Sequence, residues 1–215
     1  MAGSLTFAIG VAVSPIPIAA IVLILGGARA RVNGPLFAAG WTAGVAISAT
    51  FFFVLAHASG IADDQPTWLA VAELAIGTAF AVFAVRLLAT PRRVRADVPA
   101  WLSTLDAYGP AKAVGLGVAL SGANPKNLAL ALGGALALAQ AGLSGAEALP
   151  ALAAYTTVAA AGVLLPLAAY ETLPGRSRSA LEWARRFVIR YDRTLLIVLA
   201  LVIGAKFLVD GTQAL

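Results

Sequence analysis

The sequence contains no cysteine and one histidine, His57, which excludes disulfides, thiolate metal sites and histidine-rich metal centres. It is also poor in charge, because only 12% of its 215 residues are charged, whereas a soluble domain carries roughly 25%. Since 60% of the residues are hydrophobic, the solvent that fits this composition is lipid. We find no nucleotide-binding loop, no paired metal carboxylates and no Ser/His/Asp set. We therefore expect neither an enzyme nor a bound cofactor or metal.

Six apolar segments are each long enough to cross a bilayer, which takes about 20 residues for roughly 30 Å of hydrocarbon. We place these spans at Leu5–Ala28, Pro35–Ala58, Trp68–Thr90, Ala113–Ala141, Glu147–Tyr170 and Thr194–Val209. The first span is not expected to be a cleavable signal peptide, because it lacks a basic n-region and has proline at its centre. The sequence thus predicts an all-α integral membrane protein with six transmembrane helices.

The net charge of +5 is explained by basic residues in alternate loops. Arg29 and Arg31 lie in the first loop, and the third and fifth loops are also rich in arginine. The second loop instead carries Asp63 and Asp64, and the fourth carries Glu147. The positive-inside rule places the first, third and fifth loops in the cytoplasm and both termini outside, in a multi-pass plasma-membrane protein. We therefore expect no nucleic-acid partner.

The fifth loop predicts an additional amphipathic helix at 176–193. Trp183, Phe187 and Tyr191 follow helical spacing, and arginines take much of the remaining surface. Such a helix lies in the inner headgroup layer, where it either anchors the orientation of the chain or gathers anionic lipid headgroups. In the second case the headgroup contacts would come from Arg185, Arg186 and Arg190.

Prolines interrupt the first and fourth spans at matching places, in Ser14-Pro15-Ile16-Pro17 and in Ser121-Gly122-Ala123-Asn124-Pro125-Lys126-Asn127. Proline breaks a helix interior, whereas Ser and Asn before proline favour a helix start. Each motif therefore predicts a Pro-broken span with a second half-helix that begins near the bilayer centre. Alternatively, the prolines only kink packed helices.

Each half of the chain contains three spans, an odd number, so the two halves would insert in opposite orientations as inverted repeats. We predict a first three-helix repeat at 1–95, a cytoplasmic linker at 96–112, and a second repeat at 113–215 that includes the amphipathic segment. The N-termini of the two half-helices would then meet near mid-membrane, where they favour an anion.

This meeting point is the predicted substrate site. Its candidate residues are Ser14, Pro15, Pro17, Ser121, Asn124, Pro125, Lys126 and Asn127. A buried cation such as Lys126 costs several kcal/mol unless it is paired, so its partner is expected to be Glu73 or the substrate itself. A proton-coupling role for this pair, or snorkelling of the lysine, stays open. Lys206 and Asp210 can pair four residues apart, either as a structural bridge or as an outer gate.

Both proline motifs resemble those of the LysE-type exporter superfamily. More narrowly, the chain resembles the GAP family of glycolipid- and sulfolipid-addressing proteins of actinobacteria. The residues that carry the narrower resemblance are Asn124-Pro125-Lys126-Asn127, Ala139-Gln140-Ala141-Gly142-Leu143, Gly204-Ala205-Lys206 and Asp210-Gly211. The resemblance implies a six-helix plasma-membrane protein that helps to move glycolipids toward the cell surface, often beside a larger lipid exporter.

The leading interpretation is a transporter or flippase that exports an anionic amphiphile, such as a glycolipid or lipid-linked sugar, by alternating access. One alternative is a LysE-type exporter of a small amino acid. Another is a non-transporting accessory subunit of a lipid export machine. The expected partners are the lipid substrate and the membrane, while a larger lipid exporter and a homodimer stay open.

Overall fold

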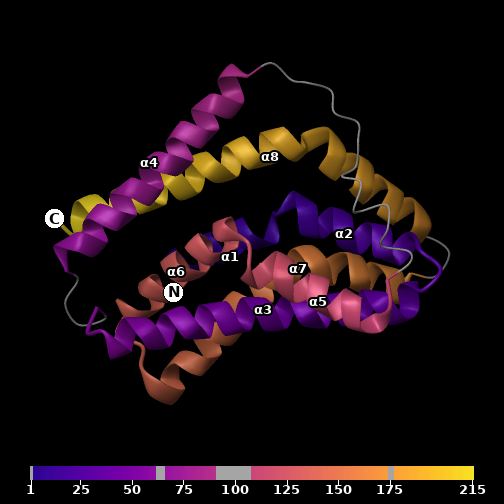
Figure 1. Ribbon diagram of the computed structural model, residues 1–215, viewed down its shortest axis with the longest axis horizontal. Coiled ribbons are helices and arrows are strands. Elements are labelled where there is room, and N and C mark those ends of the chain that lie inside the picture. The colour runs from indigo at the N-terminus through magenta and orange to yellow at the C-terminus, as the bar shows by residue number, and fades with distance from the viewer. Residues whose placement is uncertain (1, 62–65, 91–107, 174–176) are drawn as a thin grey trace.

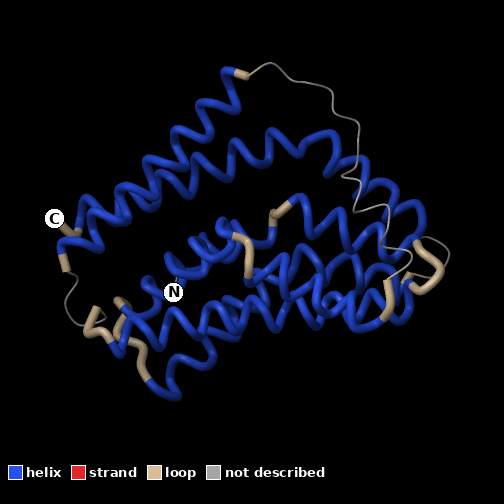
Figure 2. The backbone as a smooth tube through the Cα atoms, in the orientation of Figure 1, coloured by secondary structure: helices blue, strands red, loops and turns tan. Residues whose placement is uncertain are grey.

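The structure is a computed structural model that describes residues 2–61, 66–90, 108–173 and 177–215, without the side chains of residues 2, 177–192 and 195. Every regular element in these residues is helical (Figure 2). The elements are α1 (Ala2–Ala12), α2 (Pro15–Gly26), α3 (Ala30–Ala58), α4 (Thr67–Ala89), α5 (Pro110–Gly122), α6 (Pro125–Ala139), a 3-10 turn (Gly145–Ala148), α7 (Leu149–Thr172) and α8 (Ser177–Gln213). Figure 1 shows α4 and α8 side by side as a pair that lies over the other helices.

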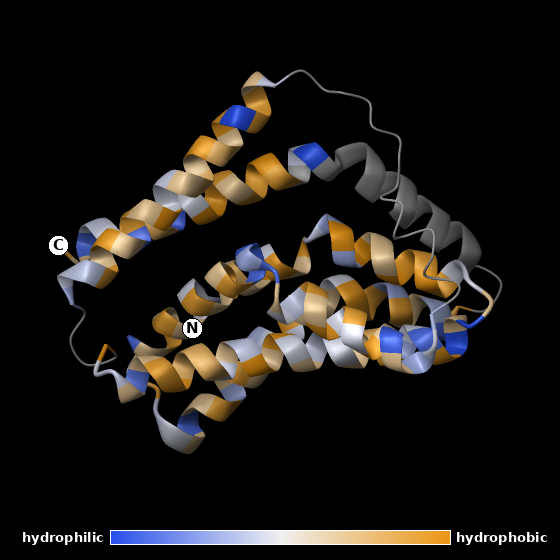
Figure 3. Cartoon of the chain, viewed as in Figure 1, coloured by the Kyte–Doolittle hydropathy of each residue, from blue (hydrophilic) through white to orange (hydrophobic). Residues whose placement is uncertain are grey.

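Several helices are long and apolar enough to span a membrane. In the described residues these are α3, α4, the segment Gly145–Thr172 and the Leu196–Gln213 part of α8, and α1 with α2 makes a fifth span if the bent pair counts as one. Large apolar side chains such as Ile47, Phe51 and Val85 are exposed on these helices, and hydrophobic residues occur along their whole length in Figure 3. Because such a surface is stable only against lipid, the chain is an all-helical membrane protein.

Both predicted helix breaks are present. The first span divides between Ala12 and Pro15 with a bend of 47°, and the fourth divides between Gly122 and Pro125. Neither α5 nor α6 is long enough alone to count as a span, so the structure gives four or five candidate spans where the sequence predicted six. The helix α3 begins at Ala30, earlier than predicted, because it accommodates Pro35 in its interior.

The separate amphipathic helix predicted at 176–193 is wrong as a separate element. Helix α8 runs without interruption from Ser177 to Gln213 and includes the predicted sixth span. No glycine or proline occurs between Ser177 and Ile203, so nothing in the local sequence ends the helix before the span begins. The side chains of Arg185, Arg186 and Arg190 lie outside the described residues, as does the 96–107 part of the predicted linker.

The packing joins elements from the two halves of the chain. Helix α3 packs on α5 and α6, α7 packs on α1 and α2, and α4 packs on α8. The interior holds large side chains that are almost fully buried, among them Trp41, Tyr155, Phe37 and Phe207. Each unbroken helix, α3 or α7, therefore supports the broken span of the opposite half.

A glycine lies where each unbroken helix meets a break. A Cβ atom on Gly162 of α7 would lie 1.9 Å from the carbonyl oxygen of Ala12, the last residue of α1. A Cβ on Gly44 of α3 would lie 2.0 Å from the hydroxyl oxygen of Ser121, beside the end of α5. Both distances are shorter than real Cβ contacts. Only glycine therefore allows α7 and α3 to pack this closely against the two breaks.

We expect Gly162→Val to destabilise the protein in detergent by about 5–10 °C in thermal midpoint, because overpacking against backbone forces the break to shift. Circular dichroism at 222 nm would measure the midpoint. The matched control is Gly115→Val in α5, where a new Cβ meets no atom within 4 Å. Equal loss of stability in the two variants would mean that the close seat at Ala12 does not hold the fold.

Candidate functional site

The two helix breaks have nearly the same backbone geometry. Ser14 stands at the N-cap of α2 with φ −76° and ψ 117°, and Asn124 stands at the N-cap of α6 with φ −84° and ψ 117°. The Asn124 Oδ1 atom accepts a hydrogen bond from the backbone nitrogen of Lys126 at 3.0 Å, as an N-cap side chain does. The Ser14 hydroxyl makes no such bond to its own helix, which leaves it available to another partner.

That partner is Lys126. Its ammonium nitrogen donates to the Ser14 hydroxyl oxygen at 2.6 Å and to the Gly10 carbonyl oxygen at 3.2 Å. Both acceptors belong to the first broken span, while Lys126 begins the second half of the fourth. The predicted meeting of the two breaks is thus present, and a single side chain links them over 112 positions of sequence.

The predicted bridge between Lys126 and Glu73 is not seen among the described residues. Within the described residues Lys126 makes no ion pair, and its two hydrogen-bond partners are neutral oxygens. Glu73 is buried, at 3% exposure, on α4. The other expected partner, an anionic substrate, stays a prediction.

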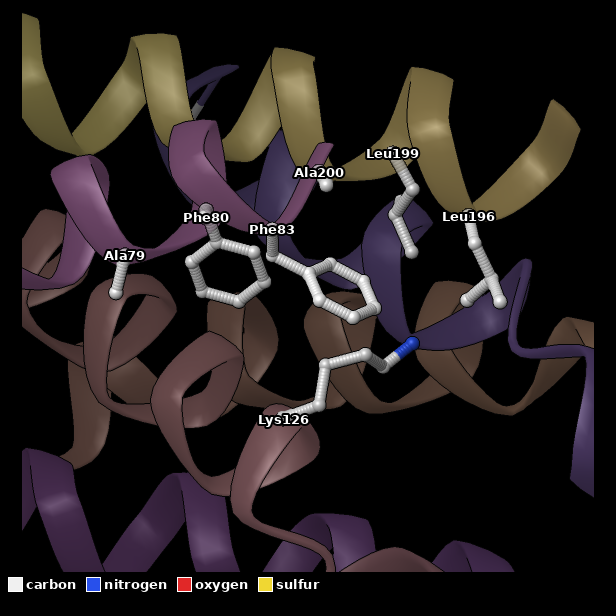
Figure 4. Close-up of a pocket in the computed structure, with 7 residues that line it drawn as sticks. All are labelled: Ala79, Phe80, Phe83, Lys126, Leu196, Leu199 and Ala200. Atoms are coloured by element: carbon white, nitrogen blue, oxygen red, sulfur yellow. The ribbon is translucent and has the colours of Figure 1, made fainter. Parts of the chain in front are cut away.

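Lys126 borders a cavity of about 290 Å³ between α6 and the α4–α8 pair. Figure 4 shows its side chain extended beneath the phenyl rings of Phe80 and Phe83. The other lining residues are Ala79 from α4 and Leu196, Leu199 and Ala200 from α8. The chamber is therefore apolar on every lining side chain except one, and that one carries a positive charge.

Two other predicted site residues, Ser121 and Asn127, make hydrogen bonds near the second break. The Ser121 hydroxyl donates to the Gly117 carbonyl oxygen at 2.9 Å and is buried against α3. The Asn127 side-chain nitrogen donates to the Leu120 carbonyl oxygen at 3.0 Å, and Asn127 is also buried. Neither residue lines the cavity. Of the two bonds, the one from Asn127 to Leu120 joins α6 to α5 across the break from which Lys126 extends.

The prolines at the start of α2 weaken the predicted anion site there. Pro15 and Pro17 have no N–H group, so Ile16 supplies the only backbone donor among the first three residues of that helix. On α6, Pro125 likewise has none, and the nitrogen of Lys126 is used by Asn124. Few donors are left for an anion at either helix start. The positive charge of the site is therefore chiefly the Lys126 ammonium.

The predicted pairing of Lys206 with Asp210 is confirmed, since the two side chains form an ion pair along α8. The Lys206 ammonium also lies over the ring of Phe7, 5.6 Å from its centroid. Phe7 packs on Phe207 with ring centroids 5.1 Å apart, and Phe207 stacks on Phe80 at 6.5 Å. Because Phe80 also lines the Lys126 cavity, an aromatic layer connects that cavity to the ion pair.

The sequence reasoning missed the apolar residues of the cavity, chiefly Phe80, Phe83 and Leu199. Each is one of many large hydrophobic residues in its span, and no local pattern separates it from those that face lipid. These residues could have been identified only if it had been known that α4 and α8 both lie next to the second break. In the described part of the chain, no cluster of three or more His, Cys, Asp and Glu residues could hold a metal ion.

The family model described as Sap, sulfolipid-1-addressing protein, matches residues 5–213. The match includes both helix breaks, the cavity residues and the Lys206–Asp210 pair. No curated protein and no solved structure is matched by the chain.

Proposed function

The chain belongs to the sulfolipid-1-addressing protein family, and from this premise we propose that it exports an anionic amphiphile of the glycolipid class. A role in lipid or glycolipid export or addressing follows from the family. The finer proposal is a flippase that binds the anionic headgroup of its substrate at Lys126 and carries it across the membrane by alternating access.

The observation that carries this proposal is one ammonium group in an otherwise apolar chamber. Lys126 is held by two neutral oxygens and, within the described residues, has no anionic side chain as a partner. A charge desolvated in this way attracts an anion far more strongly than an exposed charge does. An amphiphile matches both features, since its anionic group pairs with Lys126 and its chain stays among apolar side chains.

A small amino acid fits the same chamber less well. Its carboxylate would pair with Lys126, but its ammonium group would need an acceptor or an anion nearby. The lining residues other than Lys126 are alanine, leucine and phenylalanine, which offer neither. The amino-acid exporter is therefore the weaker candidate. A non-transporting accessory subunit would not explain why the cavity has a lysine among apolar lining residues.

We infer that α1–α4 and α5–α8 are inverted repeats that rock against each other. The supporting observations are the matched N-cap geometry of Ser14 and Asn124 and the matched seats of the two breaks on Gly162 and Gly44. In this arrangement the basic loops face the cytoplasm, both termini lie outside the plasma membrane, and α1 and α6 form the outer halves of the two broken spans.

Purified protein in liposomes tests the proposed function. The protein is expected to accelerate movement of a sulfated glycolipid between leaflets by at least about tenfold over its uncharged parent glycolipid, because only the anion pairs with Lys126. A dye-quenching assay of headgroup exposure measures both rates, and protein-free liposomes give the background. Counterflow of amino acids without lipid movement would favour the amino-acid exporter. Movement of neither substrate by the pure protein would favour the accessory subunit.

A further inference from the structure

The helix α4 has an unusual position in the packing. Within the described residues it packs on α8, and no comparable packing joins it to α6. The helix α8 in turn packs on α2, α7 and α1, so it holds the α4–α8 pair to the rest of the protein. Both α4 and α6 nevertheless line the Lys126 cavity. The wall of the cavity between α4 and α6 is therefore not closed by helix packing.

The exposure of the α4 side chains shows where the cavity opens. Phe83 lines the cavity and is 45% exposed, and Ala79, one turn earlier, is exposed as well. Phe80, between them, is only partly exposed and stacks on Phe207 in the aromatic layer. Both exposed residues lie inside α4, a helix long and apolar enough to span a membrane, so acyl chains are the expected surroundings. The exposed edge of the cavity is therefore at Ala79 and Phe83, inside the expected span.

We propose that an anionic amphiphile enters the Lys126 cavity sideways from the bilayer, between α4 and α6, with its chain lying against Phe83. The anionic group pairs with the Lys126 ammonium, and the first part of the chain contacts Phe80 and Leu199. This inference rests on the proposed function, of which it specifies the binding pose and the route of access.

The size of the cavity supports this pose. At about 290 Å³ it is just below the roughly 300–1,000 Å³ that small-ligand pockets span. It has room for an anionic group and the adjoining part of one chain, but not for a whole glycolipid. The rest of the substrate must extend out of the cavity, and the opening at Phe83 lets the chain do so without leaving an apolar environment.

Photolabelling tests the pose. The probes are two alkyl sulfates in liposomes, one with a diazirine beside the sulfate and one with a diazirine at the far end of the chain. The first is expected to label Ala79–Phe83 or Leu196–Ala200, and the second is expected to label lipid. Lys126→Met should lower labelling by the first probe by about tenfold, because the anion loses its partner. Labelling that peaks on another face, such as the groove that Thr42 of α3 and Leu164 of α7 line, would overturn the proposal.

A blocked opening gives an independent test. Ala79→Trp places a large ring in the opening and is expected to slow both labelling by the first probe and lipid movement by about tenfold or more. The control is Val85→Trp, on an exposed part of α4 that does not line the cavity. If Ala79→Trp moves lipid as fast as the control while Lys126→Met fails, the route is wrong and the proposed function stands. If the first probe labels the expected residues but no lipid moves, the binding site is supported and the export function is wrong.

Discussion

Lys126→Met is expected to reduce the rate of anionic amphiphile export by about 10- to 100-fold. A hydrogen bond to a charged group contributes about 1.5–3 kcal/mol, and each 1.4 kcal/mol is about tenfold in rate or affinity. Methionine keeps most of the length of the lysine side chain and suits the apolar chamber, but it cannot attract an anion. Initial rates of headgroup exposure in liposomes, at equal amounts of inserted protein, measure the effect.

Lys112→Met is the matched control for this variant. Lys112 is exposed near the start of α5, with its ammonium 5.7 Å from the centroid of the Tyr108 ring. Its removal changes the net charge by the same amount and should leave the rate within about twofold, since an exposed charge acts weakly at a distance. Because Lys126→Met also removes the hydrogen bonds to Ser14 and Gly10, its thermal midpoint is measured beside that of the control, and rates are compared for folded protein only. Export by Lys126→Met at the control rate would rule out this lysine as the anion site.

The fold was predictable from sequence wherever local chemistry decides it. Pro15 and Pro125 end the preceding half-helices because they lack an N–H group, and Ser14 and Asn124 before them occupy the expected N-cap positions. The resemblance to glycolipid- and sulfolipid-addressing proteins was equally readable and is confirmed by the family match over residues 5–213. The prediction of a separate amphipathic helix was wrong because the change from an arginine-rich stretch to an apolar one was taken as the boundary between two helices. A helix is ended by glycine or proline, and neither residue occurs between Ser177 and Ile203 of α8.

The site was predictable only in part. The approach of Lys126 to Ser14 was expected from the predicted inverted repeat, which was inferred from the alternating loop charges. The partner of Lys126 did not follow, because the choice between Glu73 and a neutral oxygen depends on tertiary packing, including the register of α4 along α8. Small residues set that register by close approach, as where Gly77 of α4 and Gly204 of α8 meet. The same tertiary contacts select Phe80 and Leu199 as cavity residues from many similar side chains.

The broken spans are packed unequally at their two ends. The half-helices α1 and α6 pack against each other, whereas within the described residues α2 and α5 have no comparable contact. The aromatic layer of Phe7, Phe80 and Phe207 and the Lys206–Asp210 pair lie toward the α1–α6 end. The half-helices α1 and α6 are thus in contact at this end, beyond Lys126. The proposed alternating access would require a second state in which α1 and α6 separate here.

A disulfide between α1 and α6 should therefore stop transport. A Cβ atom on Gly3 would lie 3.6 Å from the Cβ of Ala137, within the roughly 3.5–4.5 Å that a disulfide needs. Because the chain has no cysteine, Gly3→Cys with Ala137→Cys creates a single defined pair. We expect the oxidised double variant to export at least about tenfold more slowly than its reduced form, because the disulfide prevents α1 and α6 from separating. Reduction should restore the rate.

The single variants Gly3→Cys and Ala137→Cys, treated with the same oxidant, are the controls, since neither can form the bond within one chain. Mass spectrometry of the intact protein gives the oxidised fraction, so that the remaining rate can be compared with the fraction left open. A rate that falls in proportion to the oxidised fraction supports separation of α1 from α6 in each cycle. Full export by completely oxidised protein would show that the outer half-helices stay together, and the halves would then have to move about some other contact.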